Sequence, residues 1–195
     1  MKKIITIGRE YGAGGGEIGR RVSRELDIPY YDRDIILKTA LASGKLAPEQ
    51  VRRWDERVPS SFGFAQSLFD FYNRPLDEEL WKAQCDAIRT LANQESCVIV
   101  GRNSDYILGE FDHCLHVFVH AGLQWRINRM VQMYHLTPEQ AAKDAHEADR
   151  ARKRYCEYYT RKSYGDARSY DLTLNTEKLG VDRAVQMVLE AAQAI

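Results

Sequence analysis

A glycine-rich segment between an apolar run and a helical pattern is the feature that most constrains this fold. Residues 8–21 read "GREYGAGGGEIGRR", and four of the five residues from Gly12 to Gly16 are glycine. The run Ile4–Ile7 before this segment is typical of a short buried strand. After it, apolar residues recur every four positions, as in an amphipathic helix: Ile18, Val22 and Leu26. The chain therefore predicts a strand, a glycine loop and a helix, in that order.

Such a loop has the chemistry of an anion site. Glycines expose successive backbone N–H groups, and the amino terminus of the following helix adds partial positive charge. Lys plus Arg number 28, as do Asp plus Glu, so no overall basic field attracts nucleic acid or an anionic membrane. The charge for an anion must therefore be supplied locally. A turn that binds nothing is the alternative, although so many glycines cost folding entropy without adding packing.

Further apolar runs with helical patterns between them predict a parallel sheet in an α/β domain. After Ile4–Ile7 these runs are Cys97–Val100, Leu115–Val119 and Leu172–Leu174. The segment "IPYYDRD", from Ile28 to Asp34, is interpreted as another short strand with polar residues at its carboxyl end. Ligands collect at that edge of open α/β sheets.

Residues 35–95 contain no strand pattern and are expected to form a helical insertion in a single domain of residues 1–195. One helix is expected to begin at Pro48. Another is indicated by the spacing of Leu80, Ala87, Ile88 and Leu91. A cover over a ligand and a plain scaffold excursion are both compatible with this region.

Residues 137–169 begin with a helix-start pattern, in which Thr137 and Gln140 can form a capping box around Pro138. The segment then becomes densely charged and ends in a polar, tyrosine-rich stretch. The apolar spacing of residues 181–195 predicts a packing helix at the carboxyl end.

Cysteine spacing and the amino terminus bear on the protein's environment. The four cysteines form no CxxC pair, which argues against a zinc site and favours reduced thiols: Cys85, Cys97, Cys114 and Cys156. The first apolar run has four residues, too few for a signal peptide or a membrane span, so a cytoplasmic protein is expected.

The glycine loop fits neither of two known nucleotide-binding patterns in full. In GxxxxGK[ST], aligning "GAG" puts Gly15 at the lysine, and we take Glu17 to stand where the magnesium-binding hydroxyl is expected. The dinucleotide pattern GxGxxG matches at Gly14, Gly16 and Gly19, but its first glycine should follow the strand directly. Loop length therefore favours a mononucleotide phosphate cradle over a dinucleotide site.

Several segments together resemble the cytidylate kinase-like family, a branch of the nucleoside monophosphate kinase-like P-loop proteins. They are "ITIGREYGAGGGEIGRRVSREL", "YYDRDII", "VIVGRNSDYIL" and "DRARKRYCEYYTRKSYGDARSYDLTLNT", and their order and spacing cover most of the chain. The resemblance implies a P-loop kinase-like three-layer fold with a central parallel sheet. It also implies a helical acceptor-side insertion at 35–95 and an arginine-bearing helical lid at 137–169.

The missing lysine raises the question of which side chains stabilise the phosphates. Arg9 at the start of the loop is the nearest candidate, since a guanidinium can bridge phosphate oxygens with two hydrogen bonds; an exposed strand-end charge is its alternative role. Arg126 and Arg129 are spaced to share one helix face. Asp149 and Arg152 resemble the family's "DxxR" element, which implies that Arg152 approaches the transferring phosphoryl group. Arg154 and Arg161 are further candidates, with Arg161 expected to be catalytic; a solvated helix face is the alternative for both, because dense charge usually marks such a face.

Acceptor-side candidates follow two of the expected strands. By resemblance to the "GRD" segment of cytidylate kinases, Arg102 binds the acceptor phosphate. Asp105 is expected to organise the acceptor, magnesium or an arginine, with a helix-cap role as its alternative. Asp32 is expected to contact an acceptor sugar or base or to bind magnesium through water, again with capping as the alternative.

The leading hypothesis is magnesium-dependent phosphoryl transfer from ATP to a nucleoside monophosphate, with CMP or dCMP as the expected acceptor, or to a related small phosphate acceptor. The expected donor-binding residues are Gly12, Ala13, Gly14, Gly15, Gly16, Glu17 and Arg126. A nucleotide-binding regulator without efficient turnover is the second hypothesis, supported by Gly15 and Glu17; an NAD-linked enzyme is the third. Tyrosines mixed with basic residues near the carboxyl end suggest single-stranded nucleic acid, but the neutral net charge weakens that interpretation.

Overall fold

A five-stranded, all-parallel sheet forms the centre of the protein in this computed structural model, which describes residues 2–32, 35 and 78–195. The strands are β1 (Ile4–Arg9), β2 (Tyr30–Tyr31), β3 (Cys97–Val100), β4 (Cys114–His120) and β5 (Leu172–Asn175). Their order across the sheet is β2-β3-β1-β4-β5. Each predicted strand is present. The helix expected from Pro48, and most of the insertion expected over 35–95, lie outside the described residues.

The helices match most of the predicted periodicities. They are α1 (Gly15–Leu26), α5 (Glu78–Gln94), α6 (Ser104–Ile107), α7 (Leu123–Tyr134), α8 (Pro138–Thr160), the 3-10 helix η1 (Ala167–Ser169) and α9 (Thr176–Gln193). The predicted capping box is confirmed, because Thr137 accepts from the Gln140 amide and Gln140 accepts from the Thr137 amide. Helix α9 begins earlier than expected, directly after β5, and is kinked at Gly180.

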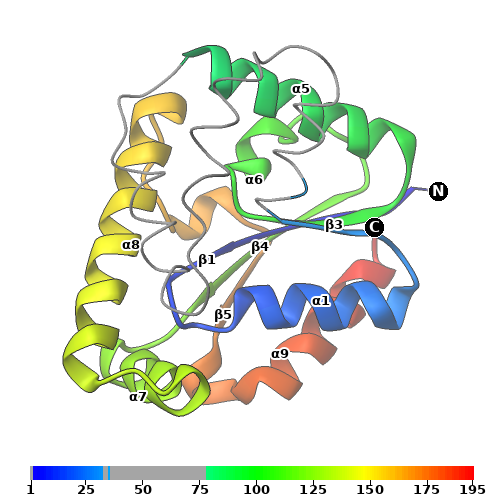
Figure 1. Cartoon of the computed structure of the whole chain (residues 1–195). Coiled ribbons are helices and arrows are strands. Elements are labelled where there is room, and N and C mark those ends of the chain that lie inside the picture. The colour runs from blue at the N-terminus through cyan, green and yellow to red at the C-terminus, as the bar shows by residue number, and fades with distance from the viewer. Residues whose placement is uncertain (1, 33–34, 36–77) are drawn as a thin grey trace.

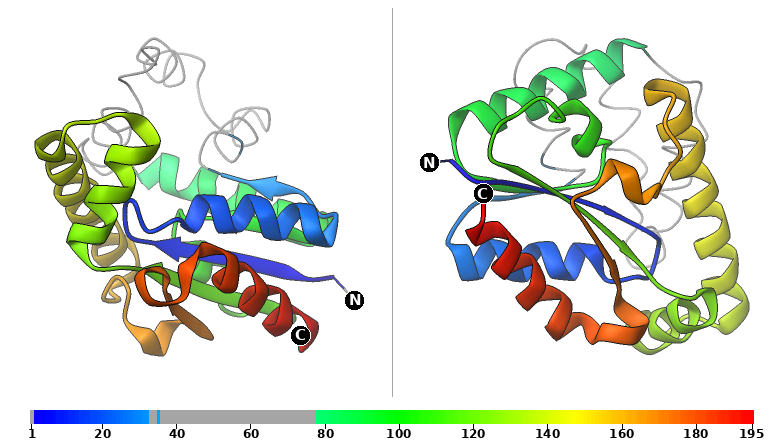
Figure 2. Two further views of the ribbon diagram at one scale, coloured as in Figure 1. Left: turned by 90° about the horizontal axis from the view of Figure 1, so that it is seen from below. Right: turned by 180° about the vertical axis from the view of Figure 1, so that it is seen from behind.

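The sheet is the middle of three layers (Figures 1 and 2). Alternate strand residues point to opposite faces. Ile5 and Ile7 belong to the core cluster that includes α1 and α9, whereas Ile4 belongs to the cluster with α5 and α6. The expected three-layer α/β architecture is thus confirmed.

Helices α7 and α8 lie beyond the carboxyl ends of the strands (Figure 1). A third cluster joins them to the glycine loop through Tyr11, which packs with Ile127, Met130 and several alanines of α8. The alanines recur along one face and let the two helices approach closely: Ala141, Ala145, Ala148 and Ala151.

Strand register fixes which residues meet at this edge. Ile7 lies opposite Val100, so Gly101 follows β3 beside Gly8, and Arg9 lies opposite Val119. The carboxyl ends of β1 and β3 therefore bring the glycine loop and the segment Gly101–Asp105 together. Within the described residues, no helix combines the length and apolar character needed to span a membrane.

Candidate functional site

The backbone carbonyls of the glycine loop are all hydrogen-bonded. Glu10 O accepts from the Ala13 amide and Gly14 O from the Ile18 amide, so these two close turns within the segment. The others are bound by side chains from three helices and from the segment after α8. Arg152 (3.0 Å) and Tyr164 (2.5 Å) donate to Arg9 O, Arg126 to Tyr11 O (2.9 Å), Arg129 to Gly12 O (3.3 Å) and Thr176 to Ala13 O (2.8 Å).

Several backbone amides of the glycine loop, in contrast to its carbonyls, have no hydrogen-bond partner among the described residues. Helix α1 has Gly14 at its N-cap and no side-chain cap, so the amides of its first turn lack intrahelical acceptors. Among the described residues, no hydrogen bond is formed by the amides of Gly12, Gly14, Gly15, Gly16 and Glu17. Those same five residues line a pocket of ≈ 160 Å³. Unpaired amides at a helix amino terminus are suited to bind an anion, and we call this part of the pocket the cradle.

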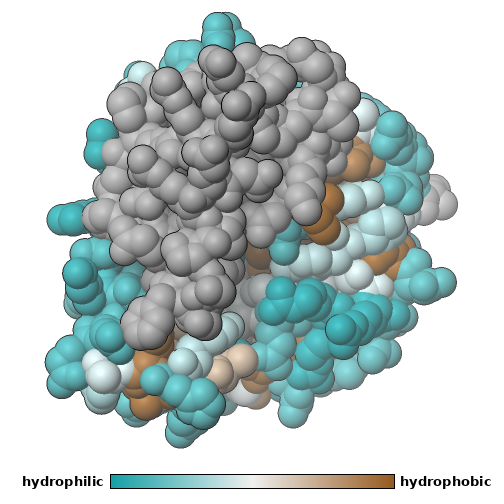
Figure 3. Space-filling view, viewed as in Figure 1, coloured by the Kyte–Doolittle hydropathy of each residue, from teal (hydrophilic) through white to brown (hydrophobic). Residues whose placement is uncertain are grey.

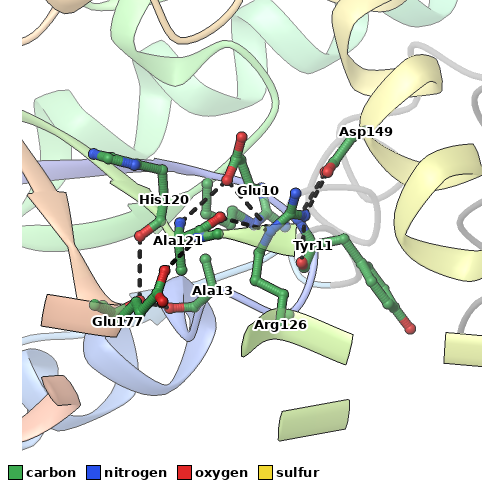
Figure 4. A network of polar contacts seen from close by, with 12 residues as sticks. Glu10, Tyr11, Ala13, His120, Ala121, Arg126, Asp149 and Glu177 are labelled. Carbon is green, nitrogen blue, oxygen red and sulfur yellow. Dashed lines mark hydrogen bonds and ion pairs between the residues drawn. The ribbon is translucent and has the colours of Figure 1, made fainter. Parts of the chain in front are cut away.

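Arg126 on α7 forms a network of polar contacts with the loop (Figure 4). The residue is 6% exposed, and its side chain also donates to Ala121 O (3.0 Å). Asp149 contacts both this arginine and the loop. Its carboxylate lies 2.6 Å from the Arg126 guanidinium and accepts a hydrogen bond from the Tyr11 amide at 2.7 Å. Glu10 completes the network by accepting from the Ala121 amide and lying 3.4 Å from Arg126 Nε. Arg126, expected to bind donor phosphate, is instead used on the protein's own carbonyls and carboxylates, because α7 points it under the loop.

The pocket itself contains other arginines. Arg9, Arg20, Arg129 and Arg152 line it together with the glycines. Arg129, the partner expected on the same helix face as Arg126, is the one of the two that reaches the pocket. Its Nη2 lies 2.5 Å from Glu17 Oε2. A carboxylate–arginine pair therefore lines the same pocket as the glycines.

Glu17 does not occupy the hydroxyl position of the lysine pattern, contrary to the expectation. In GxxxxGK[ST] the hydroxyl residue follows the lysine directly. With Gly15 at the lysine, the hydroxyl position is therefore Gly16, and Glu17 lies one residue further along helix α1. The pattern's metal-binding hydroxyl is absent, and Glu17 is an addition to the loop rather than its replacement.

A second, smaller pocket lies beside the first at the end of β3. It is lined by Gly8, Arg9, Gly101, Arg102, Asn103, Asp105, Arg152, Tyr155 and Tyr164. Arg102 and Asn103 both adopt left-handed backbone conformations, with φ of 65° and 51°, and both are buried. The buried Asn103 Nδ2 has no hydrogen-bond partner within the described residues. Arg102 and Asp105 thus lie together near the loop, as their position after a strand predicts.

Arg9 and Arg152 line both pockets. Arg152 is 5% exposed and its guanidinium lies 5.8 Å from the centre of the Tyr11 ring. Arg9 extends towards β3, so that an ideal Cβ built on Gly101 falls within 2.9 Å of its Cζ. Two cationic side chains therefore stand at the boundary between the cradle and the second pocket.

Burial changes the titration of groups around both pockets. Burial raises the pKa of Asp105 to about 6, against the lowering effect of hydrogen bonds from nearby amides and of Lys162. Burial also raises the pKa of Tyr30, which accepts from Arg20 at 3.4 Å. Burial raises the pKa of Tyr11 as well, so this phenol stays neutral under its packing helices.

Three other residues that the sequence predicts to belong to the site are Asp32, Ala13 and Arg161. Asp32 lines the larger pocket and also accepts a hydrogen bond from the Ile35 amide at 3.4 Å. The structure is therefore compatible with a ligand-binding role and with the alternative capping role. Ala13 is buried under the loop. Arg161 ends α8 and lies 5.9 Å from the Tyr158 ring, outside the lining of both pockets.

Metal ligands are sparse in the described part of the chain. No group of three histidine, cysteine or acidic residues has the geometry of a metal site there, and the four cysteines are free. Three carboxylates line the larger pocket: Glu10 and Glu17, which contact arginines, and Asp32. Magnesium commonly uses one or two carboxylates, water and substrate phosphates. Asp32, which lines the pocket, is a ligand of the kind that magnesium uses in this way.

Comparison with known proteins places this geometry in a family. A family model described as "Cytidylate kinase-like family" matches residues 4–178. No curated protein matches the chain significantly. The match spans the glycine loop, both pockets and helices α7 and α8.

Solved structures share the fold at low identity. An uncharacterized protein from Eubacterium ventriosum is 23% identical, with a TM-score of 0.77 and full coverage of both chains. Shikimate kinase from Bacteroides thetaiotaomicron is 14% identical, with a TM-score of 0.56 and 98% coverage of each chain. A gluconokinase from Sinorhizobium meliloti is 16% identical, with a TM-score of 0.52, covering 98% of this chain and 90% of its own. The chain has a P-loop kinase-like fold.

Proposed function

The chain belongs to the cytidylate kinase-like family, and from this premise we propose that it transfers the γ-phosphoryl group of ATP to a nucleoside monophosphate, with CMP or dCMP as the expected acceptor. The observation that carries the proposal is the loop in which every carbonyl from Arg9 to Gly14 accepts a hydrogen bond, while five residues whose amides form none line a pocket. Phosphoryl transfer depends chiefly on such positioning and on charge stabilisation.

The two pockets suggest how donor and acceptor are arranged. The amides of Gly12 and Gly14–Glu17 bind the donor's β and γ oxygens. Arg102 binds the acceptor phosphate in the second pocket. Arg9 and Arg152, at the boundary between the pockets, stabilise the charge of the phosphoryl group as it moves. An oxygen of the acceptor phosphate forms the new bond, the bond to ADP breaks, and the products are ADP and a nucleoside diphosphate.

Magnesium has a limited place in this scheme. Asp32 is the residue that would hold the ion, directly or through water. When bound, the ion would supply neutralisation of phosphate charge. The remaining stabilisation falls to the chain's own arginines, because Gly16 offers no hydroxyl.

A nucleotide-binding regulator is the second candidate. It is favoured by the Glu17 carboxylate in the larger pocket and by the absence of both the lysine and the hydroxyl. Such a protein binds nucleotide but forms little product in the presence of any acceptor.

The test is magnesium-dependent ADP formation from ATP with CMP, dCMP, UMP, AMP and GMP, each with product identification and a control without acceptor. Shikimate and gluconate belong in the panel because the structural neighbours include kinases of those names. The proposal predicts conversion of one monophosphate to its diphosphate. Preference for a hydroxy acid would keep phosphoryl transfer and overturn the acceptor. ATP binding without acceptor-dependent ADP would support the regulator.

A further inference from the structure

The loop keeps the spacing of the lysine pattern but exchanges two of its residues. With Gly14 as the second glycine of GxxxxGK[ST], the first glycine falls at position 9 and the lysine at position 15. The chain has Arg9 and Gly15 at these positions. A cationic side chain thus stands where the pattern has glycine, and glycine stands where the pattern has the cation.

The two positions cannot both carry a side chain in this backbone. An ideal Cβ built on Gly15 falls 2.6 Å from Arg9 Cβ and 3.0 Å from Arg9 Cγ. Real Cβ atoms essentially never approach other heavy atoms within 3.0 Å. Because the clash involves the Cβ of residue 9, any residue other than glycine at position 9 would meet a side chain at position 15.

Backbone conformation does not explain Gly15. It lies in the first turn of α1 and lacks the positive φ that Gly12 and Gly14 have, at 79° and 93°. Glycine is the poorest helix former apart from proline. The neighbouring Gly16 has the same helical setting, but a Cβ there meets only Arg20 and Tyr30 atoms at 3.8 Å or more. Space beside Arg9 is the requirement that distinguishes Gly15 from Gly16.

We infer that Arg9 and Gly15 are a reciprocal exchange, in which the phosphate-binding cation of the loop comes from the end of β1 instead of the first turn of α1. The inference rests on the proposed function for its ligand. It also explains the direction of Arg9, whose side chain passes Gly15 and ends against Gly101, a residue held at φ 81°. From there the guanidinium serves both pockets, whereas a lysine at position 15 would start from the helix.

The steric conflict between side chains at positions 9 and 15 is tested by thermal unfolding, which needs no ligand. Gly15→Ala is expected to lower Tm by about 4–10 °C, as overpacking does in a chain of this size. Gly16→Ala, the matched control, is expected to leave Tm unchanged or raise it. In an Arg9→Gly background the cost of Gly15→Ala should disappear, because the opposing Cβ is gone. An equal cost in both backgrounds would overturn the inference.

The role of Arg9 as the phosphate-binding cation is tested by binding of ATP and of inorganic tripolyphosphate. Binding is measured by calorimetry on variants of unchanged fold. Arg9→Gly is expected to weaken both ligands at least tenfold, and Arg9→Gly/Gly15→Lys to recover most of that loss. A folded double variant that binds no better than Arg9→Gly would contradict the exchange. A wild-type protein that binds tripolyphosphate but not ATP would reject the proposed donor and keep the exchange. One that binds neither would reject both.

Discussion

Asp149 on α8 contacts Arg126 on α7 at 2.6 Å and, through its other oxygen, the Tyr11 amide at 2.7 Å. One carboxylate thereby joins two helices to the glycine loop. Arg126 is 6% exposed, and its buried positive charge is compensated by the carboxylates of Asp149 and Glu10. The loop's shape is therefore set by residues more than a hundred positions away in the sequence.

Asp149→Asn is expected to lower the free energy of unfolding by about 2–3 kcal/mol. Removing one partner leaves a buried guanidinium poorly compensated, and the 24% exposure of Asp149 moderates the loss. The control is Glu157→Gln on the same helix, whose pair with Lys153 is exposed and 3.9 Å long; it should change stability by less than about 0.5 kcal/mol. Urea unfolding measures both, and equal losses would show that Asp149 does not brace the loop.

Arg152→Gln is expected to reduce kcat by about a hundredfold or more with little change in ATP affinity, because its charge is used mainly on the moving phosphoryl group. Lys153→Gln, one residue along and exposed, provides the control. Steady-state kinetics and equilibrium binding on both variants separate the two effects. A purely structural role would show instead as a lower Tm with kcat retained in the folded fraction.

Glu17→Gln is expected to tighten ATP binding about two- to tenfold. The change removes negative charge beside the cradle and releases Arg129 from its 2.5 Å contact. Glu25→Gln, exposed further along α1, should leave the affinity unchanged. Calorimetry at two salt concentrations checks the electrostatic origin, since screening should reduce the difference. Weaker ATP binding by Glu17→Gln would mean that the carboxylate positions Arg129 for the ligand.

Asp105 should make stability depend on pH in an unusual direction. Burial raises its pKa from 3.8 to about 6, so between these values the folded protein holds a proton that the unfolded chain has lost. Stability from this group therefore falls as pH rises from about 4 to 6. Asp105→Asn removes the effect, and its stability relative to wild type should increase by about 1–2 kcal/mol between pH 4.5 and 7. Urea unfolding at both pH values tests this, with the exposed Asp112→Asn as the control; a pH-independent difference would contradict it.

Much of the fold follows from local patterns. The apolar runs locate the strands, and the Thr137–Gln140 capping box marks the start of α8 correctly. Helix α9 was expected to begin near Val181. It starts at Thr176, because Asn175 caps it directly from β5 and Gly180 only kinks it.

The site was harder to predict because it depends on long-range packing. Spacing alone could not tell which of Arg126 and Arg129 faces the pocket, since both lie on one face of α7. The answer depends on Asp149, whose carboxylate holds Arg126 under the loop. The Arg9–Gly15 exchange, by contrast, can be found from the sequence. When the lysine pattern is aligned with Gly15 at its lysine, its first glycine falls at Arg9.

Figure 3 shows mostly hydrophilic side chains on the side that includes α1, with apolar groups scattered among them. The described features that converge are the loop amides, the arginines around them and the two adjacent pockets.

Phosphoryl transfer to a monophosphate is tested by measuring the ADP released and the acceptor phosphorylated in the same reaction, with purified protein, magnesium, ATP and the preferred monophosphate. Phosphoryl transfer predicts one diphosphate formed for each ADP, and loss of both in Arg152→Gln. ADP released without phosphorylated acceptor, or no turnover from a preparation that binds ATP, would show that the protein does not phosphorylate this acceptor.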